Sequence, residues 1–203
     1  MQDDLPFIAI LRGITPDEIL EHAEALARER FLAIEVPTNS PDWKTSVSRL
    51  ATTYHERPEV GAGTVLRRED VDALAATGAR LMVTPNTDEA IIRHAKTKGL
   101  RAFIGAMTPS EALAAVDAGA DALKIFPASI VGPGYARILK AVLPDRIPLY
   151  AVGGITPANL VEYAGVGWTG FGLGSELYRS GQTVDDTRAS AARFRRAWEE
   201  LRR

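Results

Sequence analysis

The chain has 203 residues, of which 46% are hydrophobic and 25% are charged, and its formal net charge is -2. This composition predicts an ordinary globular domain, and the near-neutral charge gives no electrostatic footprint for nucleic acid. The absence of cysteine excludes disulfides, thiolate nucleophiles and cysteine-held metal sites. Because the sequence has neither a signal-peptide pattern nor a run of about 18 apolar residues, we expect a cytoplasmic protein with small-molecule partners and no membrane association.

The first half of the chain alternates short apolar runs with helical patterns. The run 7–11 predicts a strand, and the Thr15-Pro16-Asp17-Glu18 segment after it is a capping box that predicts the start of a helix. The same order then recurs, with strands expected at 31–37, 60–65 and 81–85 and helices at 39–56, 67–77 and 87–98.

The second half continues the alternation without a linker or a low-complexity tract. A second capping box, Thr108-Pro109-Ser110-Glu111, follows the strand 102–105 and predicts a helix that ends at Gly119. Further strands are expected around Lys124, at 149–154 and at 170–175, with helices at 134–142, from 156 onward and at 185–201.

The pattern contains eight strands and eight helices, and each strand is a continuous apolar run. Such runs are typical of parallel sheets that helices cover on the outside. Eight units favour closure over an open doubly wound sheet, which usually has fewer strands. We therefore predict one α/β domain over residues 1–203 with the (β/α)8 barrel fold.

Polar side chains interrupt the apolar runs near the predicted carboxyl ends of the strands. They are Arg12, Glu35, Thr64 and Lys124. In a (β/α)8 barrel these ends surround one mouth, and side chains alternate between the interior and the helices. Alternation should direct the neighbours of Lys124 and Glu35 outward, and both charged groups should therefore face the barrel interior.

Lys124 is the residue that most needs an explanation, because burying an ammonium group costs several kcal/mol unless it is paired or neutral. One interpretation is a structural ion pair within the barrel. The other is an amine with a lowered pKa that forms an imine with a carbonyl substrate. Glu35 has two compatible interpretations: a partner that neutralises Lys124, or a group that transfers protons.

Glycine clusters follow the last two predicted strands, at Gly153-Gly154 and around Gly172 and Gly174-Ser175. Glycine lets backbone N–H groups approach an anion, and these loops often bind phosphate in such barrels. Ordinary turn chemistry is the alternative. Arg12 could clamp a carboxylate or simply be solvated, and Thr64 could donate a hydrogen bond to a substrate or fill the strand.

The aromatic and histidine residues indicate no further site. The three tryptophans are expected to be packing residues. The three histidines lack the spacing of metal ligands, and we expect them at the surface. The sequence therefore predicts no metal site and no cofactor. The tryptophans are Trp43, Trp168 and Trp198, and the histidines are His22, His55 and His94.

Seven segments, in order and at matching spacing, resemble the class I pyruvate aldolases that act on 2-keto-3-deoxy-6-phospho sugar acids. The resemblance extends over almost the whole chain. The segments are Ile10-Leu11-Arg12-Gly13-Ile14, Glu35-Val36-Pro37, Gly61-Ala62-Gly63-Thr64-Val65, Val83-Thr84-Pro85-Asn86, Leu123-Lys124-Ile125-Phe126-Pro127, Val152-Gly153-Gly154-Ile155-Thr156-Pro157 and Gly172-Leu173-Gly174-Ser175.

The resemblance implies a Schiff base between Lys124 and the C2 carbonyl of the substrate, with Glu35 moving protons through a water molecule. It implies that phosphate binds at the glycine loops, and that the protein is a homotrimer acting on a phosphorylated 2-keto-3-deoxy sugar acid. The substrate-binding residues that it implies are Arg12, Thr64, Gly153, Gly154, Ile155, Gly174 and Ser175.

The segment 39–43 resembles the galactonate branch of these aldolases. Where the 6-phosphogluconate enzymes commonly carry an arginine, this chain has Asn39. The resemblance thus implies cleavage of the 6-phosphogalactonate substrate, with the gluconate epimer, together with 4-hydroxy-2-oxoglutarate activity, as the alternative. Two further alternatives are a phosphate-binding barrel of the thiamine-phosphate synthase or epimerase type and an inactive metabolite sensor.

Overall fold

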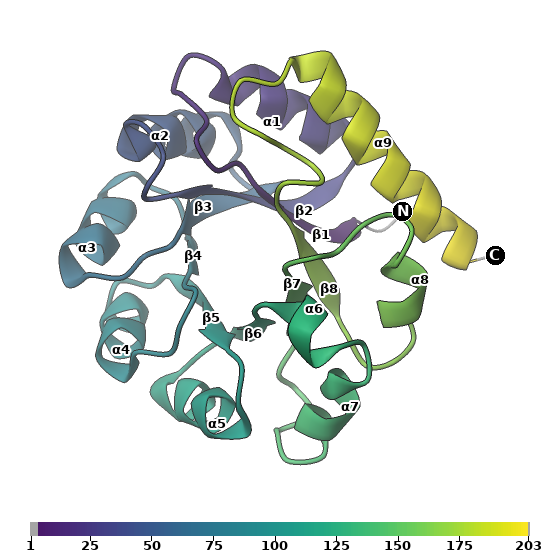
Figure 1. Ribbon diagram of the computed structural model, residues 1–203. Coiled ribbons are helices and arrows are strands. Elements are labelled where there is room, and N and C mark those ends of the chain that lie inside the picture. The colour runs from purple at the N-terminus through teal and green to yellow at the C-terminus, as the bar shows by residue number, and fades with distance from the viewer. Residues whose placement is uncertain (1–3, 203) are drawn as a thin grey trace.

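The computed structural model describes residues 4–202, and in it eight parallel strands close into a barrel in sequence order (Figure 1). The predicted (β/α)8 fold, the TIM barrel, is confirmed. The strands are β1 Leu5–Ile10, β2 Phe31–Pro37, β3 Glu59–Gly63, β4 Leu81–Val83, β5 Arg101–Ala106, β6 Ala122–Ile125, β7 Leu149–Val152 and β8 Gly170–Leu173.

Helices surround the barrel, and the long α9 lies beside α1 (Figure 1). The short α6, which directly follows the strand of Lys124, was not predicted. The helices are α1 Ile19–Arg28, α2 Trp43–Thr53, α3 Arg68–Ala76, α4 Glu89–Thr97, α5 Pro109–Ala118, α6 Ala128–Val131, α7 Tyr135–Lys140, α8 Leu160–Tyr163 and α9 Val184–Leu201.

One of the two predicted capping boxes starts its helix where expected. At α5, the Thr108 hydroxyl accepts from the Glu111 N–H at 3.3 Å, and the Glu111 carboxylate accepts from the Thr108 N–H at 2.8 Å. At Thr15 only one of the two hydrogen bonds of the capping box forms: the Glu18 carboxylate accepts from the Thr15 N–H at 3.2 Å. Residues 16–18 form a turn and not the first turn of the helix. The prediction that α1 starts at this box was therefore wrong by about one turn.

Alternation along the strands separates two apolar layers. Side chains such as Leu123 and Ile125 of β6 point outward into the layer between the strands and the helices. Side chains such as Ala122, Phe103 and Tyr150 fill the barrel interior. The predicted directions around Lys124 are therefore confirmed, and this alternation places its amine on the interior side of the sheet.

The tryptophans pack as predicted. Trp43 and Trp168 are buried. Trp198 of α9 lies edge-on to Phe7 and Phe171, with ring centroids 5.9 Å apart in both pairs, and this contact attaches the last helix to β1 and β8. Among residues 4–202, no helix is long and apolar enough to cross a membrane.

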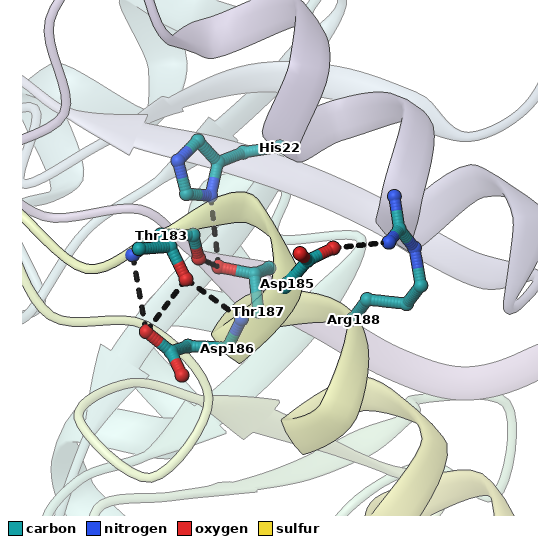
Figure 2. A network of polar contacts seen from close by, with 6 residues as sticks. All are labelled: His22, Thr183, Asp185, Asp186, Thr187 and Arg188. Atoms are coloured by element: carbon teal, nitrogen blue, oxygen red, sulfur yellow. Dashed lines mark hydrogen bonds and ion pairs between the residues drawn. The ribbon is translucent and has the colours of Figure 1, made fainter.

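The prediction of surface histidines was wrong for His22. Its side chain is only 2% exposed because α1 packs against α9, which the sequence pattern of α1 alone does not reveal. Its Nδ1 lies 2.8 Å from the Thr187 hydroxyl at the start of α9 (Figure 2). His55 is exposed as predicted, and His94 is partly buried with its Nε2 2.9 Å from an Asp72 oxygen.

Candidate active site

A cleft of about 500 Å³ lies at the carboxyl end of the barrel. With the exception of Glu35, the structure brings all of the sequence-predicted site residues to its walls. They are Arg12, Thr64, Lys124, Gly153, Gly154, Ile155, Gly174 and Ser175. These residues come from the ends of β1, β3, β6, β7 and β8, so closure of the barrel is what assembles them.

Lys124 lies in the middle of β6, where its backbone pairs with Gly105 of β5 and Tyr150 of β7. The side chain is 7% exposed and opens into the cleft. Burial lowers the pKa of the Lys124 amine, and the nearby Arg12 charge lowers it further, against an opposing effect of Glu35. Among residues 4–202, no carboxylate oxygen lies within 4.0 Å of the Lys124 Nζ atom, the limit for an ion pair. The amine is therefore available as a nucleophile.

Glu35 lies beneath the cleft, in the barrel interior, and is 1% exposed. Burial raises the pKa of its carboxyl to about 7, against opposing effects of Lys124 and Arg12. The carboxyl can therefore both accept and donate a proton near neutral pH.

A small cavity of about 10 Å³ connects the two residues, because Glu35 and Lys124 both line it. The Glu35 Oε2 atom is buried and has no hydrogen-bond partner among residues 4–202. A cavity of this size is at the threshold for holding one water molecule, and a buried polar atom provides a partner for it. The geometry thus favours a proton path between the two groups through a single water.

Gly63 makes the room that Glu35 occupies. A Cβ atom at this position would lie 1.8 Å from the Glu35 Oε2 atom, far inside contact distance. In the pairing of β2 with β3, Gly63 lies opposite Pro37, two residues beyond Glu35. The Glu35 carboxylate therefore reaches across to the neighbouring strand. The glycine is therefore a steric requirement of this carboxylate position.

Arg12 is held at the rim by two neighbours. Its Nη1 donates to the Asn39 amide oxygen at 2.6 Å, and its Nη2 donates to the Thr64 hydroxyl at 3.5 Å. The guanidinium is thereby directed over the cleft, where it can bind an anionic group. Thr64 follows the end of β3 instead of lying within it, with a left-handed φ of 57°, so its predicted place in the strand was wrong by one residue.

The glycine loops after β7 and β8 lie on the same side of the cleft. Gly153 and Gly154 have left-handed φ values of 93° and 81°, and a Cβ at Gly154 would lie 2.6 Å from Ser129 Cβ. Turn geometry therefore explains these two glycines by itself. Gly174 is different, since a Cβ there would meet nothing within 4 Å, which leaves open space beside the loop after β8.

In the loop after β8, some backbone N–H groups are bonded within the loop and others are left as possible donors to a ligand. The N–H groups of Leu177 and Tyr178 both donate to the Gly174 carbonyl, at 2.9 and 3.0 Å. Within the described part of the chain, no acceptor is found for the N–H groups of Ser175 and Glu176. Successive free backbone N–H groups in a tight turn form a concavity suited to an anion.

Several residues of the cleft were not predicted from the sequence pattern. Phe126, Pro85, Glu176, Tyr178 and Arg179 also line it. The ring of Phe126 lies 5.3 Å from Lys124 Nζ. Glu176 and Arg179 lie within four residues of Ser175, the last residue of the glycine motif. Their place in a loop at the mouth of the predicted barrel was the signal that could have identified them as cleft residues.

The buried His22 network holds the end of this loop in place. Gln182 donates through Nε2 to the Thr187 hydroxyl at 2.6 Å and accepts from the Arg179 N–H at 2.9 Å. Thr187 in turn lies against His22 (Figure 2). The His22 ring packs edge-on to Tyr178, with the ring centroids 5.2 Å apart. The loop between β8 and α9 is thus fastened to α1.

Among residues 4–202, no group of three or more His, Asp or Glu side chains could hold a metal ion. The chemistry available in the cleft is that of a buried amine, an interior carboxyl group with a raised pKa, a rim guanidinium and free backbone N–H groups. Together these groups can form an imine with a carbonyl, move a proton at a neighbouring carbon or oxygen, and bind an anion at each end of a substrate.

A family model described as KDPG and KHG aldolase matches residues 2–190. The 2-dehydro-3-deoxy-6-phosphogalactonate aldolase of Escherichia coli (strain K12) is 50% identical over 98% of this chain and 97% of its own length. The 2-dehydro-3-deoxy-phosphogluconate aldolase of Pseudomonas aeruginosa is 32% identical over 80% of this chain and 72% of its own. A solved structure described as native KDPGal, 50% identical, superposes with a TM-score of 0.94 and covers 99% of this chain and 98% of that one.

Proposed function

This chain belongs to the KDPG and KHG aldolase family, and on that basis we propose that it reversibly cleaves 2-dehydro-3-deoxy-6-phosphogalactonate to pyruvate and glyceraldehyde 3-phosphate. The observation that carries the proposal is Lys124, a buried amine with a lowered pKa that opens into the cleft and has no ion-pair partner among residues 4–202. The whole segment 1–203 would act as one catalytic domain. The family assignment weighs against the thiamine-phosphate-synthase and sensor alternatives.

The first step forms the imine. The neutral Lys124 amine attacks the C2 carbonyl of the substrate, and the resulting carbinolamine takes up a proton from the solvent and loses water to give a protonated imine. The lowered pKa of Lys124 matters here because only the unprotonated amine has a lone pair to donate. The cationic imine then serves as the electron sink for the next step.

The second step breaks the C3–C4 bond. Glu35, through the water for which the small cavity has room, takes the proton of the C4 hydroxyl. The C3–C4 electron pair moves toward the imine nitrogen, C4 leaves as the aldehyde of glyceraldehyde 3-phosphate, and an enamine of pyruvate remains on Lys124. Protonation at C3 and hydrolysis of the imine then release pyruvate and regenerate both residues.

The two ends of the substrate bind to opposite sides of the cleft. Arg12, with Thr64 beside it, would hold the carboxylate, because a guanidinium can make two parallel hydrogen bonds to it. The phosphate would bind at the loops that contain Gly153, Gly154, Ile155, Gly174 and Ser175, where the N–H groups of Ser175 and Glu176 have no acceptor within the described part of the chain. The substrate would thus extend across Lys124.

Borohydride trapping tests the imine. The protein is reduced in the presence of pyruvate, and peptide mass mapping should locate a pyruvyl adduct on Lys124. A Lys140→Met variant is the matched control, since Lys140 is an exposed lysine on α7 and its loss should leave the adduct unchanged. An adduct on another lysine, or no adduct, would sink the proposed mechanism.

Substrate choice is tested separately by comparing kcat/KM for the galactonate and gluconate epimers, which differ in hydroxyl configuration. The proposal expects the galactonate epimer to be preferred, in line with the 50% identity to the Escherichia coli galactonate enzyme against 32% to the gluconate enzyme of Pseudomonas aeruginosa. A preference for the gluconate epimer would move this chain to the other branch.

The proposal also includes a homotrimer in the cytoplasm, as the family resemblance implies. Each of the consecutive helices α6, α7 and α8 exposes one large apolar residue, namely Ile130 at 70%, Ile138 at 61% and Val161 at 56%. Such a group of exposed side chains is typical of a protein interface. Sedimentation velocity should show a trimer, and Ile138→Asp should weaken it; a monomeric wild-type protein would contradict this part.

A further inference from the structure

The cleft contains three cationic side chains among the residues described, and two of them already have tasks in the proposed function. Arg12 faces the substrate carboxylate, and Lys124 reacts as a neutral amine. The phosphate group of the substrate carries close to two negative charges at neutral pH. Backbone N–H groups alone would leave this charge without a full countercharge, and the remaining cation at the cleft is Arg179.

Arg179 is placed on the loop that holds the free donors. Its Nε donates to the Ser175 carbonyl at 3.0 Å, and the residue lines the cleft. Its backbone N–H is fixed by Gln182 at 2.9 Å, within the network that reaches His22. The side chain is 70% exposed, so an incoming anion can reach it.

The partner of Arg179 is a weak one. Its Nη2 lies 3.6 Å from the Glu176 carboxylate, beyond hydrogen-bond distance, and both side chains are open to solvent. Exposed ion pairs of this kind contribute little to stability. A phosphate, with three acceptor oxygens and a larger charge, would bind the same guanidinium in two-pronged geometry.

We propose that Arg179 leaves Glu176 and pairs with the substrate phosphate, and that it thereby determines the preference for phosphorylated over unphosphorylated substrates. This inference rests on the proposed function. Glu176 has the opposite effect, since it competes for Arg179 and repels the phosphate from the same loop.

The test runs the reaction in the synthesis direction at saturating pyruvate, with either glyceraldehyde 3-phosphate or glyceraldehyde as the acceptor. The readout is the ratio of kcat/KM for the phosphorylated aldehyde to that for the unphosphorylated one. Arg179→Gln should lower this ratio by roughly tenfold to a hundredfold, mainly through KM, the range expected for a lost charge-assisted contact. A general loss of folding or catalysis would lower both terms together and leave the ratio unchanged.

Arg188 supplies a matched control. It is also an exposed arginine paired with an acidic residue three positions earlier, Asp185 (Figure 2). It lies on the outer helix α9 and does not line the cleft. Arg188→Gln should leave the ratio unchanged. Arg179→Lys should restore part of it because the charge remains, and Glu176→Gln should raise it because the competitor is gone.

An Arg179→Gln variant with the wild-type ratio, or one with the same loss as Arg188→Gln, would overturn the inference. Failure of the proposed function is recognised differently, by the absence of a trapped pyruvate on Lys124 in the wild-type protein. Trapping on Lys124 in Arg179→Gln, together with an unchanged ratio, would reject the role of Arg179 and keep the aldolase mechanism.

Discussion

The replacement Glu35→Gln should make the protein more stable at alkaline pH while it slows catalysis. The Glu35 carboxyl is fully buried, and burial raises its pKa from an ordinary 4.5 to about 7. Glutamine has nearly the same shape and carries no charge at any pH, so it removes the cost of burying a carboxylate. The variant therefore separates the electrostatic cost of this group from its packing.

The magnitude and sign follow from the two pKa values. Between pH 4.5 and about 7 the folded state binds the Glu35 proton more tightly than the unfolded state, so the free energy of unfolding falls as pH rises. Above pH 7 the full cost of ionising the buried carboxyl has been incurred, and the rise in the pKa of Glu35 from 4.5 to about 7 corresponds to about 3 kcal/mol. The stability of Glu35→Gln relative to wild type should thus increase by about 3 kcal/mol from pH 4 to pH 8.5.

Urea unfolding followed by tryptophan fluorescence, at one fixed protein concentration, measures this difference over the pH range. The same substitution in a Lys124→Met background is the control for coupling. There the pH dependence should move to higher pH, because Lys124 no longer lowers the pKa of Glu35. A stability difference that does not vary with pH would refute the reasoning, since it would mean that Glu35 is ionised in both states as part of an ordinary ion pair.

Three further predictions concern the position and ionisation of Glu35 and the stability contributed by the buried His22. Gly63→Ala places a Cβ 1.8 Å from the Glu35 carboxylate and should reduce kcat about a hundredfold by displacing it, while borohydride still traps pyruvate. In wild type, kcat/KM for cleavage should rise with pH to a plateau above about 7 as Glu35 ionises, and Glu35→Gln should lack this rise in a pH–rate profile. Burial lowers the pKa of His22, so the need to protonate this buried ring destabilises the folded state as pH falls below 6.5. In thermal unfolding, His22→Phe should remove this loss of stability at low pH, and it should cost about 1 kcal/mol at pH 8 because the contact with Thr187 is missing.

The sequence allowed prediction of most of the fold, because each strand of a covered parallel sheet is a local apolar run. Lys124 and Glu35 were placed in the interior by alternation alone, and both residues are buried there. Local signals were less reliable at the ends of helices. The capping box at Thr15 did not start α1, and α6, only four residues long, has too little pattern to be recognised.

His22 shows why some features could not be predicted. Its burial depends on a contact between α1 and α9, which are separated by more than 150 residues, and no pattern within either helix reports on the other. The same holds for Arg179 and Glu176, which line the cleft because closure of the barrel brings the loop after β8 beside the ends of the other strands.

The sequence by itself determined the order and number of the elements and singled out Lys124 as the candidate for an imine-forming lysine, since periodicity, glycine placement and a cation in an apolar strand are all local properties. Only the tertiary structure decided the surroundings of that lysine. It showed that no carboxylate of residues 4–202 forms an ion pair with Lys124, that Glu35 and Lys124 line the same small cavity, and that burial moves the pKa values of both groups toward neutrality. Burial and distance depend on how all eight strands close, which no short stretch of the chain contains.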